Sequence, residues 1–226
     1  MDINLHYIEQ GQGEPLILLH GNGESCDYFE HQIPFFASDY RVIALDTRGH
    51  GKSPRGEKPF TIVQFAEDLH DFMEEKGIEK AHLLGFSDGG NIALTFALNY
   101  PERIEKMIVD GANLFPSGVK PLYQWPIELG YHIANLFAKK SEKAKSNTEM
   151  LGLMVNEPHI DPADLARLTM PVLVVAGTKD MIKDKHTRLI HKSLPNAQLA
   201  ILEGDHFVAN KNADAFNKVV VEFLRN

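Results

Sequence analysis

The sequence predicts an α/β fold: a three-layer α/β/α sandwich around a mostly parallel sheet. Short apolar runs recur along the chain and are continuous rather than alternating, which is typical of strands buried on both faces. They cover residues 16–19, 42–45, 81–86, 107–109, 172–176 and 199–202. Helical patterns separate most of these runs. Because strands that alternate with helices build a parallel sheet covered on both sides, we expect a single sheet between two helical layers.

Two further elements, an edge strand near the N-terminus and a helix from residue 62, are predicted from local patterns. Residues 3–9 alternate, with apolar side chains at Ile3, Leu5 and Tyr7, which predicts an antiparallel strand near the sheet edge. A helix is predicted from residue 62, where apolar residues recur on one face. Its start carries Thr61 as N-cap with Gln64 three residues later, Phe60 and Phe65 at staple spacing, and Gly77 beyond its last turn.

Length and composition predict one domain spanning residues 1–226. With 43% hydrophobic residues the chain can bury one sizeable core. A net charge of -8 argues against a nucleic-acid partner, which would require a basic face. No apolar run approaches the roughly 18 residues of a membrane span and no basic, apolar leader is apparent, so we expect a cytoplasmic protein without a membrane partner. The sequence leaves the oligomeric state open.

Residues 113–168 interrupt the alternation of strands and helices. They contain no convincing strand, and we interpret them as a small helical cap inserted into the domain. The charged run at residues 139–145 is typical of a solvated helix face. Taken together, the large apolar side chains of the segment predict an apolar lid, although for any single one of them a place in the core of the insertion is favoured over substrate contact. These are Leu114, Phe115, Tyr123, Trp125, Ile127, Tyr131 and Phe137.

The pentapeptide at residues 85–89, Gly-Phe-Ser-Asp-Gly, lies between a predicted strand and a predicted helix. A serine on such a tight turn is lifted out of the sheet, and flanking glycines allow the close backbone approach that the turn requires. The pattern alone is common by chance. Its context makes Ser87 the candidate nucleophile.

Further motifs follow in a characteristic order: His20-Gly21-Asn22-Gly23 after one strand, Asp-Thr-Arg-Gly-His-Gly-Lys-Ser at residues 46–53 after the next, the serine turn, and a late Asp and His. From about residue 3 to residue 224 the chain resembles the α/β-hydrolase fold superfamily, as a serine esterase-like member with a small cap. The catalytic order in that family is Ser, Asp or Glu, then His. The resemblance implies Ser87, Asp180 and His206.

These three residue types suit acyl transfer. A serine hydroxyl is a weak nucleophile, so an imidazole must take its proton and later return it to the leaving group. A carboxylate must fix the imidazole tautomer and stabilise its transient charge. Asp110, at the end of another predicted strand, remains an alternative acid, because some family members place theirs there. Asp205 is a weaker alternative, since neighbouring side chains in an extended segment point apart.

Backbone N–H groups are expected to stabilise the oxyanion of a tetrahedral intermediate. Asp88 supplies one at the start of a helix, and the resemblance implies Asn22 as the second. His20, Gly21, Arg48 and His50 are expected to support the turns around them.

No cofactor or metal is expected. The single cysteine, Cys26, excludes a multi-cysteine metal site, and the histidines and glycines match no metal or nucleotide motif. The predicted activity is that of a carboxylesterase acting on small to medium apolar acyl esters, with Phe115 and Trp125 as substrate contacts. A thioesterase, lactonase, C–C hydrolase or perhydrolase remains an alternative. So does a slow-turnover receptor for a small molecule.

Overall fold

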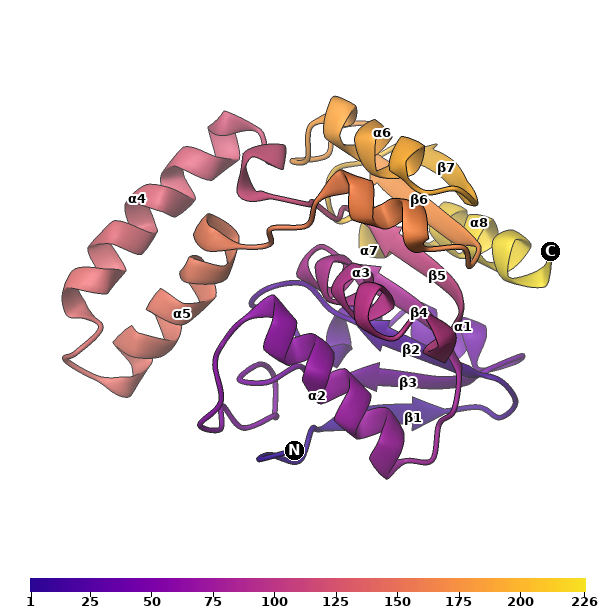
Figure 1. Cartoon of the computed structure of the whole chain (residues 1–226), viewed down its shortest axis with the longest axis horizontal. Coiled ribbons are helices and arrows are strands. Elements are labelled where there is room, and N and C mark those ends of the chain that lie inside the picture. The colour runs from indigo at the N-terminus through magenta and orange to yellow at the C-terminus, as the bar shows by residue number, and fades with distance from the viewer.

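The computed structural model describes all residues, 1–226, and contains one seven-stranded sheet in the order β1-β3-β2-β4-β5-β6-β7 (Figure 1). Only β1 is antiparallel to its neighbour; the other pairs are parallel. The predicted mostly parallel sheet is therefore confirmed. The strands are β1 Tyr7–Gln10, β2 Pro15–Leu19, β3 Arg41–Leu45, β4 Ala81–Phe86, β5 Ile104–Asp110, β6 Val172–Gly177 and β7 Ala197–Leu202.

Helices cover both faces of the sheet, and alternate side chains of each strand enter two separate cores. One core lies against α2 and α3, and the other against α1 and α8. The three-layer prediction is confirmed. The helices are α1 Gln32–Phe36, α2 Ile62–Glu75, α3 Asp88–Asn99, α4 Pro121–Phe137, α5 Glu142–Asn156, α6 Asp184–Ser193, α7 Val208–Lys211 and α8 Ala213–Arg225, with short 3-10 turns η1 Cys26–Phe29, η2 Pro101–Arg103, η3 Pro116–Gly118 and η4 Pro162–Arg167.

Helix α2 shows how local sequence sets an element's ends. The Thr61 hydroxyl accepts a hydrogen bond from the Gln64 backbone N–H at 3.1 Å, which satisfies one of the orphan donors of the first turn. Phe60 packs edge-on against Phe65, with ring centroids 4.9 Å apart. The Gln64 side chain does not complete a capping box, because it donates to Asp68 instead. Gly77 ends the helix with a φ of +62°, a conformation that favours glycine.

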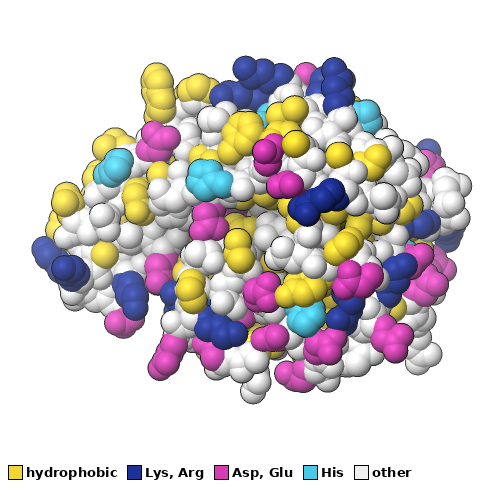
Figure 2. All heavy atoms as spheres, in the orientation of Figure 1, with side chains coloured by type: hydrophobic (Ala, Val, Ile, Leu, Met, Phe, Trp, Pro, Cys, Tyr) yellow, Lys and Arg dark blue, Asp and Glu magenta, His cyan; other side chains and the backbone are white.

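The segment between β5 and β6 forms a helical hairpin of α4 and α5 that projects from one side of the sheet (Figure 1). Each of the two helices has one buried residue, Gln124 in α4 and Leu153 in α5. Hydrophobic side chains are exposed on this part of the molecule, at the left of Figure 2. The hydrophobic side chains of α4 with the greatest exposed fraction recur three or four residues apart, at Leu122, Trp125, Leu129, Ile133 and Leu136.

The hairpin is tied to the body of the protein by polar contacts. Arg55 makes two hydrogen bonds of 2.8 Å each to the carboxylate of Glu149 in α5. The Asn22 side-chain amide donates to the Met150 carbonyl at 2.7 Å. These contacts fix α5 beside the carboxyl ends of the central strands. None of the helices is long and apolar enough to cross a membrane.

Candidate active site

Ser87 lies at the sharp turn between β4 and α3, as predicted. Its φ of +53° is the only positive φ of a residue other than glycine, so this turn is strained. The glycines beside it are required by close packing. A Cβ on Gly89 would collide with the Leu19 carbonyl, and a Cβ on Gly85 would collide with the Gly89 backbone. The turn can therefore form only with these small residues on either side of the serine.

The structure brings Ser87, His206 and Asp180 into one hydrogen-bonded chain. His206 Nε2 lies 3.0 Å from Ser87 Oγ, and His206 Nδ1 lies 2.7 Å from Asp180 Oδ1. Asp180 and His206 are both buried. Asp180 also accepts hydrogen bonds from the backbone N–H groups of Ile182 and Gly177, which hold the carboxyl group in place. This geometry can transfer a proton from serine to imidazole while the carboxylate stabilises the imidazolium.

The two alternative acids do not contact the imidazole. Asp205 accepts a hydrogen bond from the Phe207 N–H and pairs with Lys211 at the surface. Asp110 is completely buried, and neither of its carboxyl oxygens has a hydrogen-bond partner. Burial, with the charge of Asp180 nearby, raises the pKa of Asp110 well above its usual value. Its surroundings therefore favour the neutral form of the Asp110 carboxyl group.

Two backbone N–H groups are candidates to bind an oxyanion. Asp88 is the first residue of α3, and the N–H at this position has no acceptor within its own helix. The positive end of the helix dipole adds to its effect. Asn22 lies in the loop after β2, close to Ser87, and its N–H makes no hydrogen bond to another backbone group. Both predicted donors are thus near the serine, on separate segments.

His20, Thr47 and His50 form a buried polar cluster under the Asn22 loop. The Thr47 N–H donates to His20 Nε2 at 3.1 Å, and His20 Nδ1 donates to the Gly21 carbonyl at 2.7 Å. Burial lowers the pKa of His20 to about 4, so its ring is neutral. The cluster supports the turn, as expected.

Arg48 supports the neighbouring loop in the same way. Its guanidinium is fully buried and makes two hydrogen bonds each to Asp68 in α2 and to Asp2 near the N-terminus. A planar fork that pairs with two carboxylates suits arginine and not lysine. The loop of residues 46–53 is held by these bonds, away from the serine.

A small cavity of about 20 Å³ opens beside Ser87. This volume holds little more than a water molecule, so the hairpin leaves minimal space at the nucleophile. The lining residues are Asn22, Ser87, Asp88, Asn113, Val119, Met154, Glu157, Met181 and Ile182. Several of them belong to the segment between β5 and β6. No sequence motif marks Met154 or Glu157, because their approach to the serine depends on the path of the hairpin.

Phe115 and Trp125, the predicted substrate contacts, do not line this cavity. Trp125 lies on α4 with 71% of its surface exposed. Phe115 packs against the main core and stacks edge-on against His186, with ring centroids 4.6 Å apart. Their role as substrate contacts stays a prediction, since apolarity alone does not tell which face of a helical hairpin turns toward the serine. Their place over the nucleophile is taken by Val119, Met154, Met181 and Ile182.

Carboxyl groups give the cavity its charge. Burial raises the pKa of Asp88 to about 6, and the charge of Glu157 adds to this rise. Burial also raises the pKa of Glu157, whose Oε2 accepts a hydrogen bond from the Ile62 N–H at 2.6 Å. No lysine or arginine lines the cavity. The site therefore has an acidic and not a basic environment.

A family model described as the alpha/beta hydrolase fold matches residues 14–137. The match covers β2 to α4 and includes the serine turn, and it extends over more than half of the chain. This chain belongs to the α/β-hydrolase family. The resemblance seen in the sequence motifs is thereby confirmed.

Curated relatives of this α/β hydrolase are themselves hydrolases. The human protein named serine hydrolase BPHL is 31% identical over 99% of this chain and 84% of its own length. A 2-hydroxy-6-oxo-6-phenylhexa-2,4-dienoate hydrolase from Burkholderia cepacia is 31% identical over 100% of this chain and 92% of its own length. Both comparisons extend over the catalytic strands and the hairpin.

Solved structures show the same fold. The enol-lactonase from Burkholderia xenovorans superposes with a TM-score of 0.84 at 21% identity, covering 99% of this chain and 97% of that one. The meta-cleavage product hydrolase from Pseudomonas fluorescens superposes with a TM-score of 0.81 at 26% identity, covering 99% and 94%. At 21% identity, the comparison with the enol-lactonase shows a shared fold only.

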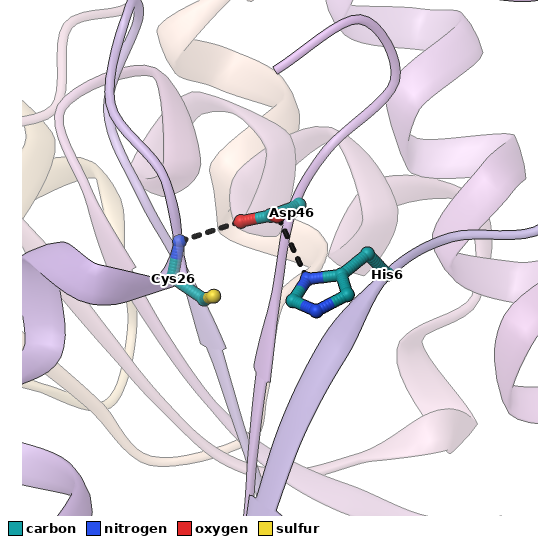
Figure 3. A group of neighbouring side chains, drawn as sticks. All are labelled: His6, Cys26 and Asp46. Carbon is teal, nitrogen blue, oxygen red and sulfur yellow. Dashed lines mark hydrogen bonds and ion pairs between the residues drawn. The ribbon is translucent and has the colours of Figure 1, made fainter. Parts of the chain in front are cut away.

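A second group of side chains in this hydrolase has a composition seen in metal sites: His6, Cys26 and Asp46 (Figure 3). Asp46 Oδ2 lies 2.8 Å from His6 Nδ1, and Asp46 Oδ1 accepts the Cys26 backbone N–H at 2.7 Å. Burial and Asp46 raise the pKa of Cys26 to about 12, so the sulfur is a thiol and not the thiolate that binds metals. The group holds the loop of residues 46–53 against β1 and η1.

Proposed function

We propose that this α/β hydrolase is a serine hydrolase that cleaves carboxylic esters through an acyl-enzyme intermediate. The observation that carries the proposal is the hydrogen-bonded chain from Ser87 through His206 to Asp180. Ser87 acts as the nucleophile, His206 as the general base and acid, and Asp180 as the group that orients His206.

The reaction proceeds in two halves. Ser87 Oγ attacks the ester carbonyl while its proton passes to His206 Nε2, and the backbone N–H groups of Asn22 and Asp88 stabilise the oxyanion. The alcohol leaves with the proton from His206. Water then attacks the acyl-enzyme, again giving a proton to His206, and the carboxylic acid is released as Ser87 recovers its proton.

The size of the cavity favours a small acyl group. With about 20 Å³ beside Ser87, even a short acyl chain requires the side chains of Met154 and Met181 or the hairpin to shift. The four apolar lining residues can surround a short alkyl group, and each buried methylene contributes about 0.8 kcal/mol.

The charge of the cavity argues against the substrates named for several relatives. A dienoate carries a carboxylate, and the curated relative from Burkholderia cepacia is named for hydrolysing one. A carboxylate would lie near Asp88 and Glu157 with no lysine or arginine lining the cavity, and like charges in a buried site repel strongly. The C–C hydrolase alternative is therefore disfavoured by this chain's own residues.

The proposal is tested with a fluorophosphonate probe and a panel of short esters and thioesters. The probe should label Ser87, as shown by mass spectrometry of the labelled peptide, and at least one short ester should be hydrolysed over many turnovers. Product formation that stops after about one equivalent would instead support the slow-turnover receptor. Label on Cys26 or on another serine would refute the assignment of the nucleophile.

A further inference from the structure

The outer face of α4 is apolar and exposed to solvent. Five hydrophobic side chains, here called the outer stripe, are each at least 50% exposed: Leu122, Trp125, Leu129, Ile133 and Leu136. Their spacing of three or four residues places them on one side of the helix, along roughly 21 Å of its length. Large exposed apolar patches mark sites of contact with a protein or a membrane.

The inner face of α4 is used for packing against α5. The Gln124 side-chain amide donates to the Met154 carbonyl at 3.4 Å. A Cβ on Gly152 in α5 would lie 3.3 Å from the ring of Tyr131, so the two helices approach closely at this point. Figure 1 shows α5 between α4 and the sheet. These contacts set the rotation of α4, and they direct the outer stripe away from the rest of the protein.

The charge beside the outer stripe is positive. The exposed side chains of α4 carry no fixed charge, and its one acid, Glu128, is half-buried. Directly beyond the helix lies a lysine segment, residues 138–145, which contains four lysines and one glutamate, all exposed. Figure 2 shows basic side chains at the end of the hairpin, beside exposed hydrophobic ones. Because the whole chain has a net charge of -8, an anionic surface attracts this end of the molecule and repels the rest.

This charge distinguishes two possible occupants of the outer stripe. A second copy of the chain would bring the same uncharged stripe and its own lysine segment, so the lysines would repel each other or stay unpaired. A bilayer with anionic headgroups pairs with the lysines and accepts the apolar side chains at the same time. Leucine and tryptophan on one face of a helix, next to lysines, are typical of helices that lie in the membrane–water interface. The charge therefore favours a lipid surface.

We propose that the outer stripe and the lysine segment bind the surface of an anionic lipid bilayer, with α4 lying in the interface. None of the helices is long and apolar enough to cross a membrane, but an interfacial helix needs only one apolar face. Lipid binding of this kind is independent of the proposed function, because no catalytic residue takes part in it.

Trp125 allows a direct measurement, because it belongs to the outer stripe and is the only tryptophan of the chain. The wild-type protein is mixed with vesicles of diether phosphatidylcholine, alone or with an equal amount of diether phosphatidylglycerol. These lipids contain no ester that a hydrolase could cleave. With the anionic vesicles the emission maximum of Trp125 should move to shorter wavelength, and the protein should float with the vesicles in a density gradient. Vesicles of phosphatidylcholine alone should bind much more weakly.

Two variants test the two parts of the surface, and both keep Trp125 as the reporter. Leu129→Gln should weaken binding to the anionic vesicles by at least about tenfold, because it removes an apolar side chain from the contact with the bilayer. Lys139→Gln combined with Lys140→Gln should weaken this binding by about 30-fold, because both lysines lie at the lipid surface. All three side chains are exposed, and circular dichroism checks that the fold is retained.

Lys185→Gln combined with Lys192→Gln is the matched control. It removes the same charge from exposed positions on α6, outside the hairpin, and should leave binding nearly unchanged. An equal loss of binding in this control would show an effect of net charge alone and would overturn the site. Equal binding to the neutral and anionic vesicles, or no shift of emission with either, would overturn it as well. A shift that needs no vesicles and grows with protein concentration, together with a dimer in size-exclusion chromatography, would assign the outer stripe to a second copy instead.

Discussion

The backbone N–H of Ser87 donates a 2.7 Å hydrogen bond to the backbone carbonyl of Asp110. This bond continues the pairing of β4 with β5 by one residue beyond Phe86, which is paired with Asp110 in the sheet. The strained serine is thus fixed by the neighbouring strand as well as by its own. The same residue of β5 carries a buried carboxyl group directly behind the turn.

Ser87→Ala should abolish labelling by the fluorophosphonate and lower kcat by about 10⁴-fold or more, because only the hydroxyl can form the acyl-enzyme. Labelling is measured by in-gel fluorescence, and kcat is measured by steady-state ester hydrolysis. Circular dichroism checks that the fold is retained. Residual turnover within tenfold of wild type would assign the nucleophile elsewhere.

Asp180→Asn should lower kcat by about 10⁴-fold, because an amide presents the wrong tautomer of His206 to the serine. Asp205→Asn should lower kcat far less, since the partners of Asp205 are Lys211 and the Phe207 N–H. The measurement is kcat with a short aryl ester. Asp110→Asn should also lower kcat far less. A greater loss of kcat in Asp110→Asn than in Asp180→Asn would make Asp110 the catalytic acid.

Asp110 should make the stability of the fold depend on pH. Its pKa is raised well above 3.8 in the folded protein by burial, while it ionises near pH 3.9 when unfolded. Between these values the folded state binds more protons, so the free energy of unfolding falls as the pH rises. Asp110→Asn removes this contribution. Urea unfolding of both proteins should show the variant gaining stability relative to wild type from pH 5 to pH 8; a constant difference would mean that Asp110 is ionised in the fold.

The sequence predicted the sheet and the serine turn because both depend on local patterns. Continuous apolar runs mark the buried strands, and the run at residues 81–86 coincides with β4. Ser87, Asp180 and His206 could be chosen because each follows a strand, and the carboxyl ends of parallel strands meet at one edge. The family resemblance favoured Asp180 over Asp110 and Asp205, and the coordinates add which carboxyl oxygen reaches the imidazole.

The hairpin could be predicted as helical, but not its orientation. Trp125 was expected over the site and lies in solvent, while Met154 was not singled out and lines the cavity. Both helices carry apolar side chains on more than one face, so periodicity does not distinguish the face toward the serine. That orientation is set by Arg55 with Glu149 and by Asn22 with Met150, contacts between residues more than ninety positions apart.

Met154→Ala should broaden the acyl-chain profile of kcat/KM toward longer esters, because it removes a large side chain from the cavity beside Ser87. Trp125→Ala should leave the profile unchanged, since its side chain is 71% exposed. The profile is measured with aryl esters of increasing acyl length. A shifted profile in Trp125→Ala with none in Met154→Ala would place the substrate under α4 and restore the lid formed by its aromatic residues.

Asn22 takes part in two features of the molecule. Its backbone N–H is the proposed second oxyanion donor, and its side chain is bonded to the Met150 carbonyl in α5. Movement of α5 would therefore break this bond or carry the Asn22 loop with the helix. Through this one residue the position of the hairpin is coupled to the position of the proposed oxyanion donor.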